Sequence, residues 1–109
     1  KYNIAVVPGP NEIEEAAKLN VNVILHNNKA VDLLGLIGLI KNSSYVISND
    51  TGPAHIAAHL NKKGLVLFGS HTTAEKVSIE TKNFQSIQVK NLNKLYVSSV
   101  LEKVKENLN

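Results

Sequence analysis

The segment of residues 44–60, SYVISNDTGPAHIAAHL, places the strongest constraint on how this chain can fold. After Ser44 come Tyr45, Val46 and Ile47, a short apolar run of residues that favour β-strands, as expected of a buried strand. Residues 49–53 are turn-forming or helix-starting. Pro53 suits the first turn of a helix, because its missing N–H would have no partner there. The segment therefore predicts a strand, a tight turn and a helix in direct succession.

The predicted turn has the properties of an anion-binding site. Main-chain N–H groups near Thr51, Gly52 and Ala54 lie at the amino terminus of the expected helix. Unpaired N–H groups and the positive end of the helix dipole favour a negative charge there. Gly52 has no Cβ atom, so a phosphate oxygen could approach the main chain closely. These features predict a phosphate site at this turn.

Strands and helices are expected to alternate along the rest of the chain. We predict strands at residues 3–7, 21–25, 45–48, 65–68 and 84–89, and helices at residues 11–19, 31–41, 53–60 and 97–108. The last helix is amphipathic, with one apolar face formed by Val97, Val100, Leu101, Val104 and Leu108. Short apolar strands alternating with helices are typical of βαβ units. The chain is therefore predicted to be α/β, with a Rossmann-like open parallel sheet and helices on both faces.

Composition limits the classes of function. At 109 residues the chain is long enough for one domain. Its formal charge of +3 comes from scattered lysines without any arginine, which argues against a nucleic-acid-binding protein. It has no cysteine, so disulfides and thiolate metal sites are excluded. No segment reaches the roughly 18 consecutive apolar residues of a membrane span. We expect a soluble, cytoplasmic protein.

The run NDTGPAHIAAHL followed by GLVLFG resembles the donor-binding half of bacterial ADP-heptose:lipopolysaccharide heptosyltransferases, glycosyltransferases of the GT-B fold. In that family a strand precedes Asp-Thr-Gly-x-x-His, an alanine-rich helix and a strand ending in Phe-Gly or Tyr-Gly. Residues 50–52 and His55 match this pattern, and Phe68 and Gly69 follow at the expected spacing. The resemblance implies that residues 1–109 are a nucleotide-sugar-binding domain, the carboxy-terminal part of a GT-B enzyme whose amino-terminal acceptor domain is absent here.

The resemblance also implies roles for individual residues. Thr51 and Gly52 would hold the diphosphate of the sugar donor, mostly through main-chain N–H groups. Asp50 and His55 would orient the sugar-phosphate end, and Glu12 corresponds to an acidic position that can reach the ribose hydroxyls. Further candidate contacts with the sugar donor are Lys29, Val31 and Gly69. No metal and no other cofactor is expected in this chain. No catalytic residue is expected either, because the base would belong to the acceptor domain.

The functional hypothesis is the donor-binding part of an enzyme that transfers heptose from ADP-heptose to the lipopolysaccharide core, inactive as a fragment. Its partners would be the nucleotide sugar and, through the missing domain, the lipopolysaccharide core. Peripheral association with the inner membrane and self-association that completes the sheet are compatible with this hypothesis. The family's sheet order puts an absent strand in the centre. Either residues 3–7 pair directly with residues 45–48, or another chain or fragment fills the gap.

Simpler interpretations stay open beside these. Asp50 could cap the following helix, Glu12 could be a solvated first-turn carboxylate, and His55 a packed histidine. The whole chain could be a stand-alone, non-catalytic nucleotide- or phosphate-binding α/β module. Two other interpretations are disfavoured. A zinc site at His55 and His59 lacks a glutamate between them, and the Asp-Thr-Gly triplet of all-β aspartic proteases conflicts with the βα alternation.

Overall fold

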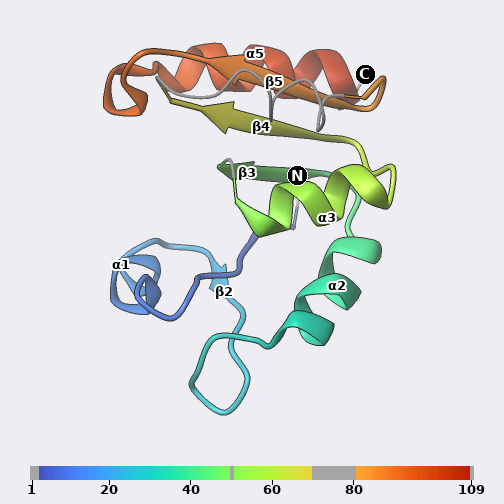
Figure 1. Cartoon of the computed structure of the whole chain (residues 1–109). Coiled ribbons are helices and arrows are strands. Elements are labelled where there is room, and N and C mark those ends of the chain that lie inside the picture. The colour runs from blue at the N-terminus through green and yellow to red at the C-terminus, as the bar shows by residue number, and fades with distance from the viewer. Residues whose placement is uncertain (1–2, 50, 70–80, 109) are drawn as a thin grey trace. The chain divides into compact units, whose positions relative to one another are not determined.

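The computed structural model describes residues 3–49, 51–69 and 81–108. The chain divides into two compact units, Lys1–Gly38 and Leu39–Asn109, and Figure 1 labels most of their helices and strands. All pairs between the described strands are parallel. The predicted α/β class with open parallel sheets and helices is confirmed. Among the described helices, none is long and apolar enough to cross a membrane.

The first unit contains a small two-stranded sheet. Strand β1 (Ala5–Val6) pairs with β2 (Asn22–Val23), and helix α1 (Ile13–Ala17) connects the two strands. A tight turn follows β2, in which the main chains of His26 and Lys29 exchange two hydrogen bonds of 2.8 and 3.0 Å. Its two central residues, Asn27 and Asn28, have φ angles of 53° and 62°, a left-handed conformation that asparagine tolerates better than most residues.

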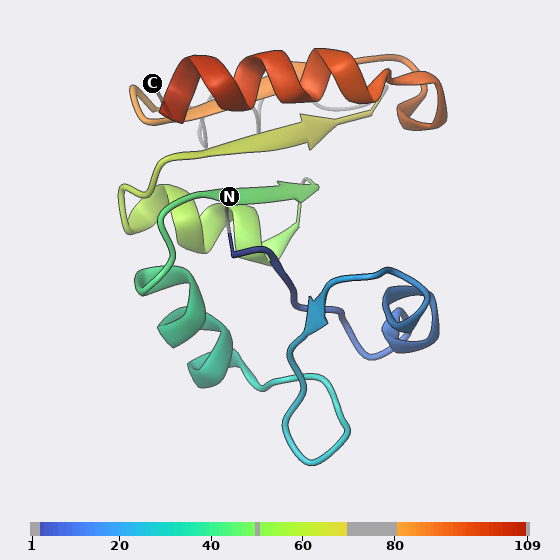
Figure 2. The same ribbon diagram turned by 180° about the vertical axis from the view of Figure 1, so that it is seen from behind.

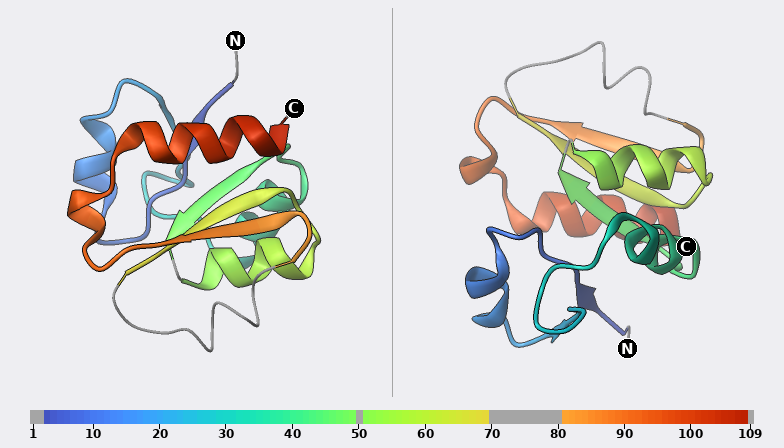
Figure 3. Two further views of the ribbon diagram at one scale, coloured as in Figure 1. Left: turned by 90° about the horizontal axis from the view of Figure 1, so that it is seen from above. Right: turned by 60° about the horizontal axis from the view of Figure 1, so that its bottom comes forward.

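Helix α2 (Leu33–Lys41) leads from the first unit into the second. The second unit holds a three-stranded sheet in the order β3, β4, β5, formed by Val46–Asn49, Gly64–Phe68 and Phe84–Gln88. Helix α3 (Gly52–His59) connects β3 to β4. After β5 come the short helix η1 (Leu92–Lys94) and helix α5 (Val97–Leu108). Figure 3 shows α3 and α5 on opposite faces of this sheet.

The core of the second unit is centred on β4. The largest fully buried side chains are Leu65, Val66 and Phe68 of β4, and Phe84 of β5. This is the pattern of a central parallel strand that is covered on both faces. Burial of each such side chain contributes on the order of 2 kcal/mol to folding. The apolar run 65–68, which the sequence predicts as a strand, therefore forms the centre of this sheet.

Helix α5 packs against β4 (Figure 2) with a narrower apolar face than the sequence predicts. Val100, Val104 and Leu108 are half-buried. In contrast, Val97 is 73% exposed and Leu101 50% exposed. The packed stripe instead includes Lys103 and Asn107, which are also half-buried. Spacing along a helix predicts that one face is apolar, whereas the sheet on which the helix packs decides which of those residues are buried.

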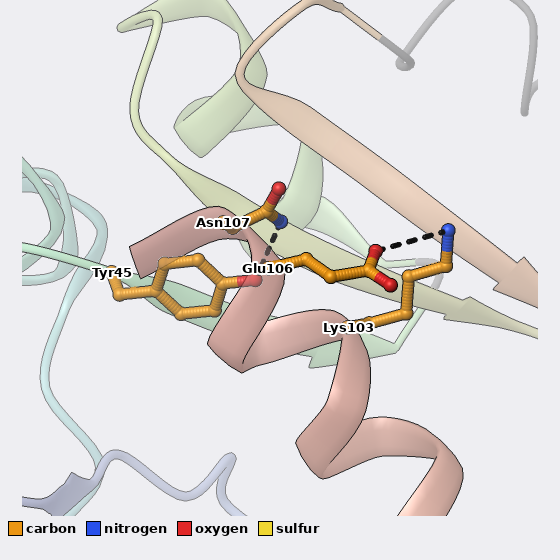
Figure 4. Close-up of polar contacts among 4 residues, drawn as sticks. All are labelled: Tyr45, Lys103, Glu106 and Asn107. Atoms are coloured by element: carbon orange, nitrogen blue, oxygen red, sulfur yellow. Dashed lines mark hydrogen bonds and ion pairs between the residues drawn. The ribbon is translucent and has the colours of Figure 1, made fainter. Parts of the chain in front are cut away.

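Two polar contacts of α5 differ in how much they can stabilise the unit (Figure 4). The Asn107 Nδ2 group donates a hydrogen bond of 2.8 Å to the Tyr45 hydroxyl, just before β3. Burial raises the pKa of the Tyr45 phenol above its ordinary value of 10.0, although this hydrogen bond opposes the change. The ion pair of Lys103 and Glu106 is 4.0 Å long and joins side chains that are 43% and 66% exposed, so it adds little. The Tyr45–Asn107 bond therefore ties the end of α5 to the start of β3.

The strand pairs that the structure describes lie within one unit or the other. Strand β1, from the predicted strand at residues 3–7, pairs with β2, and β3, from residues 45–48, pairs with β4. Direct pairing of residues 3–7 with residues 45–48, and a gap that another chain or fragment fills, both stay predictions, because the two strands belong to different units.

Candidate functional site

The predicted strand and the helix that follows it are both present, within residues 46–59. Strand β3 ends at Asn49, and α3 begins at Gly52 with Pro53 in its first turn. Thr51 is the N-cap residue of α3 and has an extended backbone, with φ −143° and ψ −178°. Asp50 lies outside the described residues. Asn49, Thr51 and Gly52 are all exposed, so the main chain on either side of Asp50 is open to solvent.

The main-chain N–H groups of this turn are less free than the sequence predicts. The Thr51 N–H donates to the Asn49 carbonyl at 2.8 Å, and the Ala54 N–H donates to the Thr51 carbonyl at 3.0 Å. The His55 N–H makes a longer bond of 3.4 Å to the same carbonyl. The Gly52 N–H makes no hydrogen bond with the described part of the chain. The expected set of three available N–H groups is therefore reduced to one, that of Gly52.

Gly52 also has open space beside it. Apart from its chain neighbours and the backbone of α3, no described atom lies within 4 Å of a Cβ atom placed on Gly52, and Gly69, which follows β4, likewise has only its chain neighbours that close. In the parallel register Asn49 lies opposite Leu67. The carboxyl ends of β3 and β4 are therefore at one edge of the sheet, the edge at which parallel α/β sheets bind ligands. The structure thus brings Thr51, Gly52 and Gly69 to the same sheet edge.

A small cluster of hydroxyl groups surrounds the Asn49 carbonyl. The Ser48 hydroxyl donates to this carbonyl at 2.8 Å, and the Thr51 hydroxyl donates to it at 3.4 Å. The two hydroxyl oxygens are 3.4 Å apart. Ser48 is not among the residues that the sequence singles out. The only available signal was a second hydroxyl residue three positions before Thr51.

The two histidines of α3 lie one helical turn apart. His55 lies in the first turn and is half-buried, and His59 is the last residue of the helix and is exposed. Within the described part of the chain, no group of three His, Cys, Asp or Glu side chains could hold a metal ion. Because Asp50 is outside that part, this finding does not concern a site that includes it. The predicted contact of His55 with a sugar phosphate stays a prediction.

The first unit holds the other three predicted site residues. Glu12 is the N-cap residue of α1, and its Oε1 atom accepts a hydrogen bond of 2.9 Å from the Gly9 N–H. The Glu12 N–H in turn donates to the Gly9 carbonyl at 3.1 Å. A carboxylate has further lone pairs for another partner. Lys29 is exposed in the tight turn after β2, and Val31 is half-buried before α2. Their contacts with a ligand stay predictions.

Comparison with protein-family models gives a match that covers almost the whole chain. Residues 2–105 match the family described as glycosyltransferase family 9 (heptosyltransferase). No curated protein and no solved structure matches the chain. The matched segment includes the turn between β3 and α3 and all the predicted site residues. The resemblance at residues 50–69 is therefore part of a similarity that extends through both units.

Proposed function

Since the chain belongs to glycosyltransferase family 9, the heptosyltransferase family, we propose that it binds the nucleotide sugar of a heptosyl transfer reaction. In this proposal the sugar donor is ADP-heptose, the acceptor is the lipopolysaccharide core, and the diphosphate lies at residues 50–52. The observation that carries the proposal is that the main chain of Gly52 is accessible to a ligand. Its N–H makes no hydrogen bond with the described residues, it is exposed, and the space beside it is open.

The chemistry of glycosyl transfer explains why such a turn is useful. An acceptor hydroxyl attacks the anomeric carbon, the bond from that carbon to the diphosphate oxygen breaks, and negative charge grows on the diphosphate. An N–H group and the positive end of α3, held in place before the reaction, would stabilise that charge. The dipole alone is worth about 0.3–1 kcal/mol for a group at a helix terminus. The turn would thus act on the leaving group rather than on the acceptor.

The other predicted residues have supporting roles in this proposal. Asp50 and His55 would orient the sugar-phosphate end, and Glu12 would accept hydrogen bonds from the ribose hydroxyls through lone pairs that Gly9 does not use. Lys29, Val31 and Gly69 would be further contacts with the nucleotide sugar. The base that takes the proton of the acceptor hydroxyl would lie in an acceptor domain outside residues 1–109. A cytoplasmic location belongs to the same proposal.

Calorimetric titration with ADP tests the turn directly. We expect Gly52→Val to weaken ADP binding about tenfold, because the added side chain fills the space that a phosphate oxygen needs and lowers affinity by about 1.4 kcal/mol. Gly38→Ala is the matched control. Gly38 likewise has no described atom within 4 Å of a built Cβ, but it lies inside α2. Equal ADP affinity of the wild-type chain and Gly52→Val would remove Gly52 from the site.

A separate experiment tests whether this chain binds the sugar donor while an acceptor domain provides the base. Heptose transfer by the 109-residue chain alone would contradict a base outside this chain. Binding of ADP without transfer agrees with the proposal. Addition of an acceptor domain should then produce transfer, whereas a stand-alone binding module would stay inactive in its presence.

A further inference from the structure

Thr51 does not use its side chain as an N-cap residue ordinarily does. A threonine at this position normally accepts a hydrogen bond from an N–H group of the first helical turn. In α3 no such side-chain bond is formed. The Thr51 hydroxyl instead lies 3.4 Å from the Asn49 carbonyl and 3.4 Å from the Ser48 hydroxyl. The hydroxyl is therefore turned back towards the strand.

We propose that Ser48 is a positioning residue that holds the Thr51 hydroxyl away from the first turn of α3. The Ser48 hydroxyl donates a short hydrogen bond of 2.8 Å to the Asn49 carbonyl. Its own oxygen then keeps lone pairs that can accept from the Thr51 hydroxyl. Thr51 thus has two acceptors on the strand side, and Ser48 provides one of them.

Strand β3 sets the place of Ser48. Burial alternates along this strand: Val46 and Ser48 are half-buried, and Ile47 and Asn49 are exposed. Ser48 therefore points to the covered face of the strand. The Thr51 N–H also donates to the Asn49 carbonyl, at 2.8 Å. The Asn49 carbonyl therefore accepts short bonds from the Ser48 hydroxyl and the Thr51 N–H, and the single proton of the Thr51 hydroxyl lies between this carbonyl and the Ser48 oxygen, each 3.4 Å away.

This arrangement has a consequence for binding that rests on the proposed function. A Thr51 hydroxyl in the capping position would place an oxygen lone pair in front of the first turn of α3. That oxygen would compete with a phosphate oxygen for the same space and the same positive potential. By keeping Thr51 away from this position, Ser48 leaves the Gly52 side of the turn free for a ligand. The cost is a helix whose first turn lacks its usual side-chain cap.

A double-mutant cycle on the chain without ligand tests the role of Ser48 by itself. Thermal unfolding is measured for the wild-type chain, Ser48→Ala, Thr51→Val and the double variant. In Ser48→Ala the Thr51 hydroxyl loses an acceptor and is left with the capping position, which the wild-type chain does not adopt because it is the less stable of the two. We therefore expect Ser48→Ala to lower Tm more, by up to about 4 °C, in the presence of Thr51 than in the Thr51→Val background. Additive effects, or a coupling of the opposite sign, would overturn the proposal.

ADP affinity tests whether Ser48 also affects the ligand. It should not change if Ser48 only stabilises the fold. Ser48→Ala should weaken ADP binding about fivefold, the equivalent of one helix cap, whereas Ser48→Thr should keep wild-type affinity because it retains the hydroxyl. Equal affinity of all three chains would contradict the effect on the ligand. If the wild-type chain does not bind ADP, the proposed function fails, and the unfolding cycle still decides whether Ser48 positions Thr51.

Discussion

At Gly64 the fold leaves no room for a side chain. Gly64 lies in β4 between Val46 of β3 and Phe84 of β5, and it is buried. A Cβ atom there would lie 2.5 Å from the Val46 carbonyl oxygen and would overlap the Phe84 ring. The sequence did not indicate this, because a glycine before an apolar run is also typical of a turn. Its role depends on two strands that are distant along the chain.

Gly64→Ala is therefore expected to destabilise the chain. The Val46 carbonyl belongs to the main chain of a paired strand and cannot move away cheaply. We expect a loss of about 2–3 kcal/mol in the free energy of unfolding, as in other overpacked cores. Urea denaturation measures it. Gly38→Ala, without a described atom within 4 Å of the new Cβ, should instead gain up to about 1 kcal/mol from helix propensity. Similar stability of the two variants would contradict the steric argument.

At the scale of elements, the attachment of α5 to β3 should depend on pH. Burial raises the pKa of Tyr45 above 10.0 in the folded chain, so the folded state keeps the phenol proton at a pH where the unfolded state has released it. This contribution to stability is fully present below pH 10 and is lost as the pH rises through the raised pKa. We therefore expect the free energy of unfolding to fall above pH 10, as measured by urea denaturation across alkaline pH.

The matching variants separate this effect from general alkaline unfolding. Tyr45→Phe removes the titrating group and the 2.8 Å bond from Asn107. It should cost about 1 kcal/mol at neutral pH and flatten the alkaline decline. Tyr96→Phe changes a side chain that is 76% exposed, so it should leave both the neutral stability and the decline unchanged. An alkaline decline of equal steepness in Tyr45→Phe would assign it to other groups.

For the whole molecule, elements were easier to predict than the pairing between them. Helix α5 begins and ends where the sequence predicts, and β3 is shifted by one residue. These elements follow from local periodicity. The order β3, β4, β5 within the second unit does not, because pairing depends on contacts between distant segments. The candidate site shows the same difference. Gly52 and Pro53 indicate the turn locally. The hydrogen bonds of the Thr51 and Ala54 N–H groups and of the Ser48 hydroxyl could not be predicted, because they depend on the three-dimensional path of the main chain.

The two units should differ in local stability. In the described part of the first unit only Pro8 and Ala16 are buried, and each of its strands has two residues. The second unit fully buries large side chains of β4 and β5, among them Phe68 and Phe84. Little buried apolar surface means a small free energy of local opening. We therefore expect the amides of β1 and β2 to exchange with solvent faster than those of β4.

Native-state hydrogen exchange measures this difference amide by amide. The β4 amides should exchange most slowly, and those of β1 and β2 at least about tenfold faster, which corresponds to about 1.4 kcal/mol of opening free energy. Gly64→Ala gives an internal control, because it should accelerate exchange in β3, β4 and β5 while leaving β1 and β2 unchanged. Equal protection of both sheets, or equal acceleration of both by Gly64→Ala, would mean that the two units unfold as one.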